Sequence, residues 1–173
     1  EYPLPLFGDV QLLNSAIAIA VIQCLRDQGW EISNLAIQEG MGKTRWAGRL
    51  QWTSWQGKQI LVDGAHNTAA AEALRQYVNS LGKPVHWVMG MLSTKDHASI
   101  FQALLHSGDR LSLVPVPDHS SAEPTVLSGI AKGICPSLET LETFLDLPTA
   151  LESAIATEEE SAIVLCGSLY LVG

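Results

Sequence analysis

The segment Leu61–Asn67 reads Leu-Val-Asp-Gly-Ala-His-Asn and continues an apolar run that begins at Ile60. A short apolar run bounded by turn residues is typical of a buried strand. Asparagine is a favoured N-cap, because its side chain accepts a hydrogen bond from the first turn of a helix. The segment therefore predicts a strand that ends at Val62, a turn at Gly64 and a helix that starts at Asn67.

The same order of strand, turn and helix repeats through the rest of the chain. Runs such as Ile163–Leu165 are apolar on both faces, which is typical of a parallel sheet covered by helices. We therefore predict an α/β fold with a mostly parallel sheet flanked by helices. The expected strands are residues 49–55, 59–62, 85–89, 111–116, 138–141 and 162–165, and the expected helices are residues 67–81, 98–105, 125–132 and 148–156.

The residues before this alternation have a different pattern. From Gln11 to Gln28 apolar side chains recur at spacings of three, four and seven, which predicts an amphipathic helix. Ser33 is a candidate N-cap for a second helix that ends near the glycines at 40 and 42. We therefore predict two domains, residues 1–43 and residues 44–173, joined by a linker that starts at Gly42.

The composition and charge indicate which kinds of molecule are disfavoured as partners of this chain. Of the 173 residues 47% are apolar, and 10 Lys and Arg oppose 18 Asp and Glu. This acidic balance disfavours nucleic acid and anionic lipid. No run appears long and apolar enough to cross a bilayer, so we expect no membrane partner. Cys24, Cys135 and Cys166 are widely spaced among apolar neighbours, which favours core packing and a reducing, cytoplasmic compartment.

Polar residues follow the strand that ends at Val62. Ligands of open parallel sheets gather at the carboxyl ends of the strands. Asp63 is suited to accept hydrogen bonds from a ribose hydroxyl or an amine, and His66 to donate one to a phosphate or carboxylate oxygen. The alternative is structural: Asp63 and Asn67 cap the turn, and His66 is a surface residue.

Two other segments carry groups that suit anions. Arg49 follows Trp46-Ala47-Gly48 at the predicted domain junction, where its guanidinium suits a triphosphate. A surface salt bridge is the alternative. After the last strand, the hydroxyls of Ser168 and Tyr170 suit a carboxylate, and the alternative there is a final turn and strand with a packed tyrosine.

Taken together, these segments resemble the folylpolyglutamate synthase and dihydrofolate synthase family, within the Mur ligase group. The resemblance is carried by residues 46–51, 61–67, 90–96 and 167–173 in that order, and by residues 8–14 near the start. Several motifs in one order are more specific than any single motif. The resemblance implies a Rossmann-like C-terminal domain that follows a helical remnant of the central ATP-binding domain.

The resemblance also implies an activity. The chain resembles part of an acid–amino-acid ligase that uses ATP and Mg²⁺ to phosphorylate the terminal carboxylate of a folate. The amino group of L-glutamate then attacks the acyl phosphate. A monomer is expected, with the metal ligands upstream and none in this chain. By resemblance, the residues at ATP are Asn14, Arg49 and Asp63, and those at glutamate are His66, Ser168 and Tyr170, with His66 a possible catalytic residue.

The chain has no GxxxxGK[ST] phosphate loop and opens without a methionine. We therefore expect the C-terminal part of a longer polypeptide, inactive without an upstream P-loop domain. Two alternatives stay open: a stand-alone, non-catalytic α/β binding module, and a domain of another Mur-type amino-acid ligase. The choice between dihydrofolate synthase, folylpolyglutamate synthase or both stays open as well.

Overall fold

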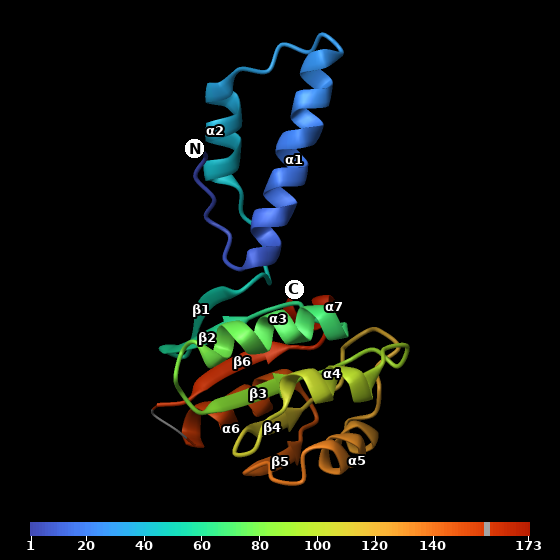
Figure 1. Ribbon diagram of the computed structural model, residues 1–173. Coiled ribbons are helices and arrows are strands. Elements are labelled where there is room, and N and C mark those ends of the chain that lie inside the picture. Colours follow the sequence, from blue (N-terminus) through green and yellow to red (C-terminus); the bar gives the residue numbers. More distant parts are fainter. Residues whose placement is uncertain (158–159) are drawn as a thin grey trace. The chain divides into compact units, whose positions relative to one another are not determined.

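The computed structural model describes residues 1–157 and 160–173 (Figure 1). It divides into two compact units, Glu1–Arg49 and Leu50–Gly173, and each is described here by itself. The sequence pattern places the boundary earlier, after Lys43. Assignment of the first unit to a central ATP-binding domain stays a prediction.

The first unit contains two helices, α1 over Asp9–Asp27 and α2 over Asn34–Lys43. Arg26, in the last turn of α1, connects them. Its Nε donates to the carbonyl of Ile32 at 2.7 Å, and its Nη2 donates to Oδ1 of Asn34 at 2.9 Å. One arginine therefore holds the connection between the helices.

The second helix begins where the sequence predicts. Ser33 is its N-cap, because the Ser33 Oγ accepts a hydrogen bond from the backbone N–H of Ala36 at 3.0 Å. The helix ends later than expected, since it continues through Gly40 and Gly42 to Lys43. Two glycines lower helix propensity but do not end a helix that already has a cap.

One surface of α1 is apolar and exposed within its unit. The window Val10–Asp27 has 18 residues and a mean hydropathy of 1.2, and none of it is buried. By length and composition this helix is sufficient to cross a membrane, which corrects the expectation that no such run exists. Core helices of water-soluble proteins meet the same criterion. The large exposed apolar side chains are Val10, Leu12, Leu13, Ile17 and Val21.

The second unit is built on a six-stranded sheet with the order β1-β2-β6-β3-β4-β5. β1 pairs with β2 antiparallel, and every other neighbouring pair is parallel. This arrangement confirms the predicted α/β fold. The strands are β1 Gln51–Trp55, β2 Lys58–Val62, β3 Val85–Met89, β4 Arg110–Leu113, β5 Thr140–Thr143 and β6 Ala162–Cys166, and the helices are α3 Thr68–Asn79, α4 His97–Leu104, α5 Pro124–Ile134, α6 Leu147–Thr157 and α7 Leu169–Val172.

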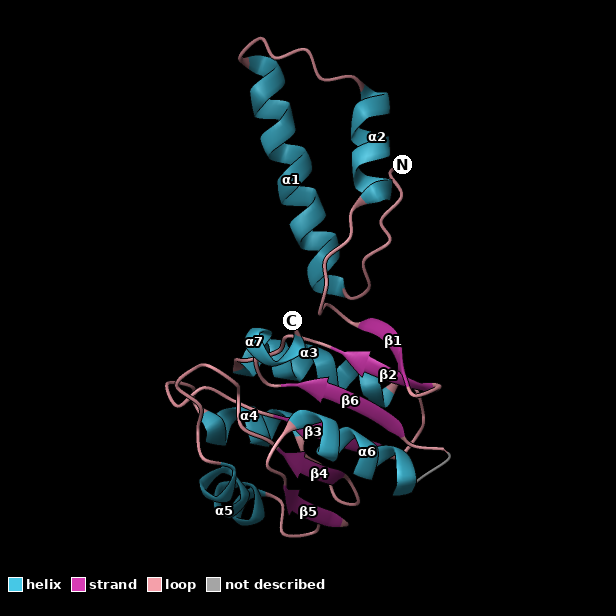
Figure 2. Ribbon diagram, turned by 180° about the vertical axis from the view of Figure 1, so that it is seen from behind, coloured by secondary structure: helices cyan, strands magenta, loops and turns pink. Residues whose placement is uncertain are grey.

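Helices cover both faces of this sheet. α3, α4 and α5 lie on one face, in front of the strands in Figure 1, and α6 lies on the other, in front in Figure 2. Successive residues of a strand point to opposite faces. Trp87 of β3 packs in the α3–α5 layer, whereas Val88 packs with Ala150 and Ala154 of α6. The strands are therefore apolar at consecutive positions because both faces are buried.

Three elements near the strand ends differ from the sequence prediction. The apolar run 111–116 predicts one strand, but β4 ends at Leu113. The N–H of Val114 still donates to the carbonyl of Met89 at 2.9 Å, and Val114 and Val116 are buried, so the apolar run extends beyond the strand because these side chains pack in the core. The fifth strand lies at Thr140–Thr143 instead of residues 138–141. After β6 the chain forms the short helix α7 in place of a turn and strand.

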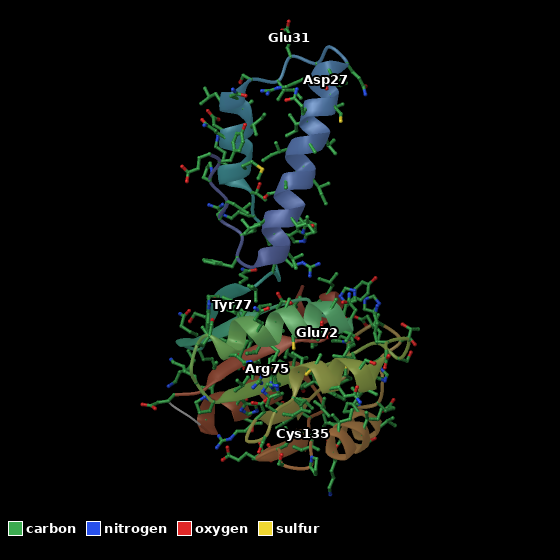
Figure 3. The ribbon with its side chains drawn as sticks, in the orientation of Figure 1. Asp27, Glu31, Glu72, Arg75, Tyr77 and Cys135 are labelled. Carbon is green, nitrogen blue, oxygen red and sulfur yellow. The ribbon has the colours of Figure 1, made fainter. Side chains whose placement is uncertain are left out.

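A buried ion pair joins α3 to the start of β4. One oxygen of Asp109, Oδ2, accepts from Nη1 of Arg75 at 2.6 Å, from Nε1 of Trp87 at 2.9 Å and from the backbone N–H of His106 at 2.9 Å. The Arg75 and Asp109 side chains are only 10% and 6% exposed, and Figure 3 labels Arg75 on α3. Removal of either partner would leave an uncompensated buried charge.

We expect Asp109→Ala to lower the free energy of unfolding of the second unit by about 3–5 kcal/mol, because Arg75 would keep its charge in a buried site. Urea unfolding followed by tryptophan fluorescence measures this loss. Glu152→Ala is the control, since Glu152 is an exposed acid of the same unit whose Oε1 accepts from Nε2 of Gln56 at 3.3 Å, so its removal leaves no buried charge. A loss for Asp109→Ala no larger than that of the control would contradict the role given to the buried pair.

Candidate functional site

The loops that follow β2, β3, β4 and β6 lie at one edge of the sheet, because parallel strands end on the same side. We name them the strand-end loops: residues 63–67, 90–96, 114–121 and 167–168. Gly167 has a φ of +102°, and a Cβ on it would lie 2.6 Å from the carbonyl oxygen of Gly90. A Cβ on Gly90 would lie 2.7 Å from the carbonyl oxygen of Val114. Only glycine permits such contacts, so these two glycines hold three of the loops together.

Asp63 connects the fourth loop to the start of the second unit. It is 7% exposed, its Oδ1 accepts from the backbone N–H of Ala65 at 2.8 Å, and its Oδ2 accepts from that of Leu50 at 2.9 Å. Leu50 has a left-handed φ of 42°, which costs free energy for a residue with a Cβ. The Ala65 carbonyl in turn accepts from the N–H of Gly167 at 3.0 Å. Asp63 therefore has the structural role that the sequence left open, and its predicted contact with ATP stays a prediction.

His66 is half-buried in the same loop. Its Nδ1 lies 2.8 Å from the carbonyl oxygen of Gly64. Because a carbonyl only accepts, Nδ1 carries the proton in this contact, and Nε2 of the neutral ring is then an acceptor. The sequence prediction made His66 a donor to an anion, which in this geometry requires a protonated ring.

Asn67 and Ser168 each cap a helix at this edge. The Asn67 Oδ1 accepts from the N–H of Ala70 at 2.9 Å, which starts α3 as predicted. The Ser168 Oγ accepts from the N–H of Tyr170 at 3.2 Å, and Ser168 is 2% exposed. A hydroxyl that accepts one hydrogen bond still has its own proton to donate. Ser168 is therefore able to donate to a carboxylate, as the sequence suggests.

Tyr170 is 59% exposed, and its ring stacks on that of His119. The two ring centroids are 3.8 Å apart, and the ring planes are inclined by 31°. His119 lies in the loop after β4. No local spacing predicts this pair, because the two residues come from loops that meet only in the folded sheet.

The loop after β3 ends in a helix cap. Asp96 accepts from the N–H of Ser99 at 3.1 Å and from its hydroxyl at 2.7 Å. The hydroxyl first, and the N–H second, lower the pKa of Asp96, so it stays ionised at neutral pH. Asp96 thus caps α4, and Lys95 beside it is half-buried.

The cysteines offer no nucleophile at this edge. Burial, and then the negative charge of Asp63, raise the pKa of the Cys166 thiol well above its ordinary value. A thiol with a raised pKa stays protonated and unreactive. Cys135 is buried as well, but Cys24 is exposed, which corrects the expectation that all three cysteines pack in a core.

The remaining predicted ATP residues belong to the first unit. Asn14 lies on α1, and its Nδ2 donates to Oε1 of Gln11 at 3.2 Å. The Arg49 guanidinium carbon lies 5.8 Å from the centre of the Trp46 ring. The structure thus brings together Asp63, His66, Ser168 and Tyr170 at one edge of the second unit, whereas a site shared with Asn14 and Arg49 stays a prediction.

The part of the chain that the structure describes contains no group of three or more His, Cys, Asp or Glu side chains placed to hold a metal ion. Two acidic side chains of the strand-end loops, Asp63 and Asp96, accept hydrogen bonds from nearby backbone N–H groups. These residues do not form a magnesium site by themselves, since hard cations need several oxygen ligands at once.

Known proteins match this chain over nearly its full length. A family model described as dihydrofolate synthetase, C-terminal domain, matches residues 49–173. A probable dihydrofolate synthetase of Schizosaccharomyces pombe is 34% identical and covers 99% of this chain and 43% of its own length.

Two solved structures agree with the family model. A bifunctional folylpolyglutamate synthase/dihydrofolate synthase of Yersinia pestis, complexed with AMPPNP and a Mn ion, has a TM-score of 0.77 and 28% identity over 99% of this chain and 39% of its own. A structure with the same enzyme name and with Mn, AMPPNP and L-glutamate bound has a TM-score of 0.77 and 29% identity over the same shares, 99% and 39%.

The chain thus spans less than half the length of these relatives. The match to the family model begins at Arg49 and includes the whole second unit with its strand-end loops. The chain therefore belongs to the dihydrofolate synthetase C-terminal domain family, whose relatives here are dihydrofolate and folylpolyglutamate synthases.

Proposed function

We propose that this chain is the C-terminal part of an ATP-dependent ligase that adds L-glutamate to a folate, and that the strand-end loops bind the glutamate. The observation that carries the proposal is the convergence of His66, Ser168 and Tyr170 on loops joined by Gly90 and Gly167, in a chain of this family. The related structure with L-glutamate and AMPPNP bound supports both ligands.

The proposed reaction has two steps. The terminal carboxylate of the folate attacks the γ-phosphorus of ATP, so that ADP leaves and an acyl phosphate forms. The amino nitrogen of glutamate then attacks the acyl carbon, and inorganic phosphate leaves as the amide bond forms. The first step is needed because a carboxylate is a poor electrophile without a leaving group.

Each predicted residue has a role that fits its position. Ser168 has a hydroxyl proton to donate to a glutamate carboxylate, and the exposed phenol of Tyr170 offers a second donor. In its neutral form His66 has an acceptor nitrogen, Nε2, which suits removal of a proton from the ammonium group of glutamate. We thus assign His66 as a general base in the second step.

For ATP, the family resemblance suggests contacts with Arg49, Asn14 and Asp63. Arg49 would place its charge at the phosphates, Asn14 would contact the base, and Asp63 would accept from the nucleoside while it keeps its backbone bonds. The Mn in the related structures favours a divalent cation such as Mg²⁺. Its ligands would come from an upstream domain, because the described residues of this chain do not provide them.

An upstream P-loop domain would also cover the exposed apolar side chains of α1. Contiguous exposed apolar surface is unusual on a monomer and marks a site of contact, and the relatives are more than twice as long as this chain. The complete protein is then proposed to be a cytoplasmic monomer. The three cysteines are free thiols, as a reducing compartment allows.

We expect the chain by itself to show no folate-dependent ATP hydrolysis and no glutamate incorporation, since it has no phosphate loop. The polypeptide that carries this chain together with its upstream region should show both activities. Incorporation of radiolabelled glutamate into dihydropteroate or tetrahydrofolate measures them and also separates the two synthase activities. Turnover by the isolated chain would refute the proposed dependence.

Arg49→Ala in the longer polypeptide should lower kcat/KM for ATP about ten- to hundredfold, as expected when a hydrogen bond to a charged group is lost. Arg45→Ala is the matched control, because Arg45 is exposed and donates to the carbonyls of the nearby residues Gly42 and Thr44. Steady-state kinetics with varied ATP compare the two variants. Equal kinetics in both would remove Arg49 from the site.

His66→Gln should lower kcat by about 10²–10⁴-fold, the usual contribution of a general base, while the KM for ATP changes little. His106→Gln serves as the control, since the His106 side chain is exposed and lies before the start of β4, whereas the strand-end loops follow the ends of the strands. Single-turnover measurements should show that acyl phosphate still forms in His66→Gln. Wild-type kcat in this variant would contradict the assignment.

A further inference from the structure

We propose that His119 is a positioning residue that holds the phenol of Tyr170 in place to bind glutamate. The proposal rests on the function given above for Tyr170 and adds a residue that no motif of the chain points to. It starts from the stacked pair of rings, whose centroids are 3.8 Å apart. The two rings come from loops after β4 and β6, strands that are separated in the sheet by β3.

Tyr170 needs such a support because its own surroundings leave it exposed. It lies on α7, a helix of only four residues, and 59% of it is accessible to solvent. Its neighbour Leu171 is the residue of α7 that enters the core. An exposed tyrosine can move between staggered rotamers, so a ring stacked on one side favours one of them.

Hydrogen bonds hold the backbone on both sides of His119, so the position of its Cα is well defined. The N–H of Ser93 donates to the carbonyl of Ser120 at 2.8 Å, and the hydroxyls of these two serines lie 2.8 Å apart. The N–H of Ser121 donates to the His119 carbonyl at 2.7 Å. The loop after β3 therefore supports the loop that presents His119.

The turn before His119 is also constrained. Asp118 has a left-handed φ of 57°, an arrangement tolerated better by aspartate than by most residues. The hydroxyl of Ser121 accepts from the N–H of Val116 at 2.9 Å, which closes the turn. The turn is thus constrained on both sides of His119, which a surface residue without a function does not require.

The position of Tyr170 explains why its orientation matters. Its N–H donates to Ser168, whose hydroxyl is proposed to bind the same substrate. Gly167, just before, is joined to the loop that carries His66. A phenol held near Ser168 adds a second donor for glutamate, and a group oriented in advance loses less conformational entropy on binding. His119 acts through Tyr170 and need not touch the substrate.

The test uses the longer, active polypeptide with His119→Ala and His119→Phe. His119→Ala should raise the KM for glutamate about two- to tenfold, the range set by the energy of an aromatic pair, and leave the KM for ATP unchanged. His119→Phe keeps a ring against Tyr170 and should restore the KM for glutamate. Failure of the phenylalanine variant to restore it would overturn a role through stacking.

A double-mutant cycle with Tyr170→Ala separates this inference from the proposed function. His119→Ala should have no further effect on the KM for glutamate once Tyr170 is absent, because coupled residues are not additive. An unchanged effect in that background overturns the positioning role alone. A Tyr170→Ala variant with wild-type KM for glutamate overturns the function proposed for Tyr170 and this inference with it.

His106→Ala, on an exposed histidine elsewhere, controls for unspecific effects, and circular dichroism confirms that each variant is folded.

Discussion

Close backbone contact between Gly167 and Gly90 is the constraint on which this edge of the sheet depends. A Cβ on either residue would lie within 2.7 Å of a carbonyl oxygen of another loop. The strand-end loops can therefore pack as one layer only because these two positions have no side chain. Ser168, His66 and His119 stand on loops whose positions follow from that backbone packing.

A site whose loops are positioned by backbone packing suits a small, charged substrate that needs several polar groups at once. Groups fixed by the fold before binding lose less entropy when the substrate arrives. Asp63 shows how one residue can serve both purposes. Its carboxylate accepts from Leu50 and Ala65, so it stabilises the start of the second unit, and it stands at the end of β2, where ligands of parallel sheets gather.

Much of this fold can be predicted from the sequence, where the local signal is strong. The bounds of β3, Val85–Met89, agree with the prediction because an apolar run stands between Pro84 and Gly90. The start of α3 is clear from the cap at Asn67. The end of β4 is not, since Val114 and Val116 remain buried beyond its last residue, Leu113. A helix of four residues such as α7 is too short to show a helical period.

Some site residues could likewise be predicted from the local sequence, and others could not. The motif around Asp63 and His66 is continuous in sequence, so it predicts its own place at the end of a strand. The contact of His119 with Tyr170 depends on the order of the strands in the sheet, which no local pattern specifies. The hydrogen bond of His66 to Gly64 also needed the folded backbone, and it changed the proton chemistry assigned to that ring.

The uneven burial of the cysteines has a practical consequence. Cys24 is exposed on α1, whereas Cys135 and Cys166 are buried, and the pKa of Cys166 is raised. Maleimides react with accessible thiolates. A fluorophore would therefore attach to the first unit at a single point without any cysteine having to be replaced. The dye would then report on the surroundings of α1 while the second unit stays unmodified.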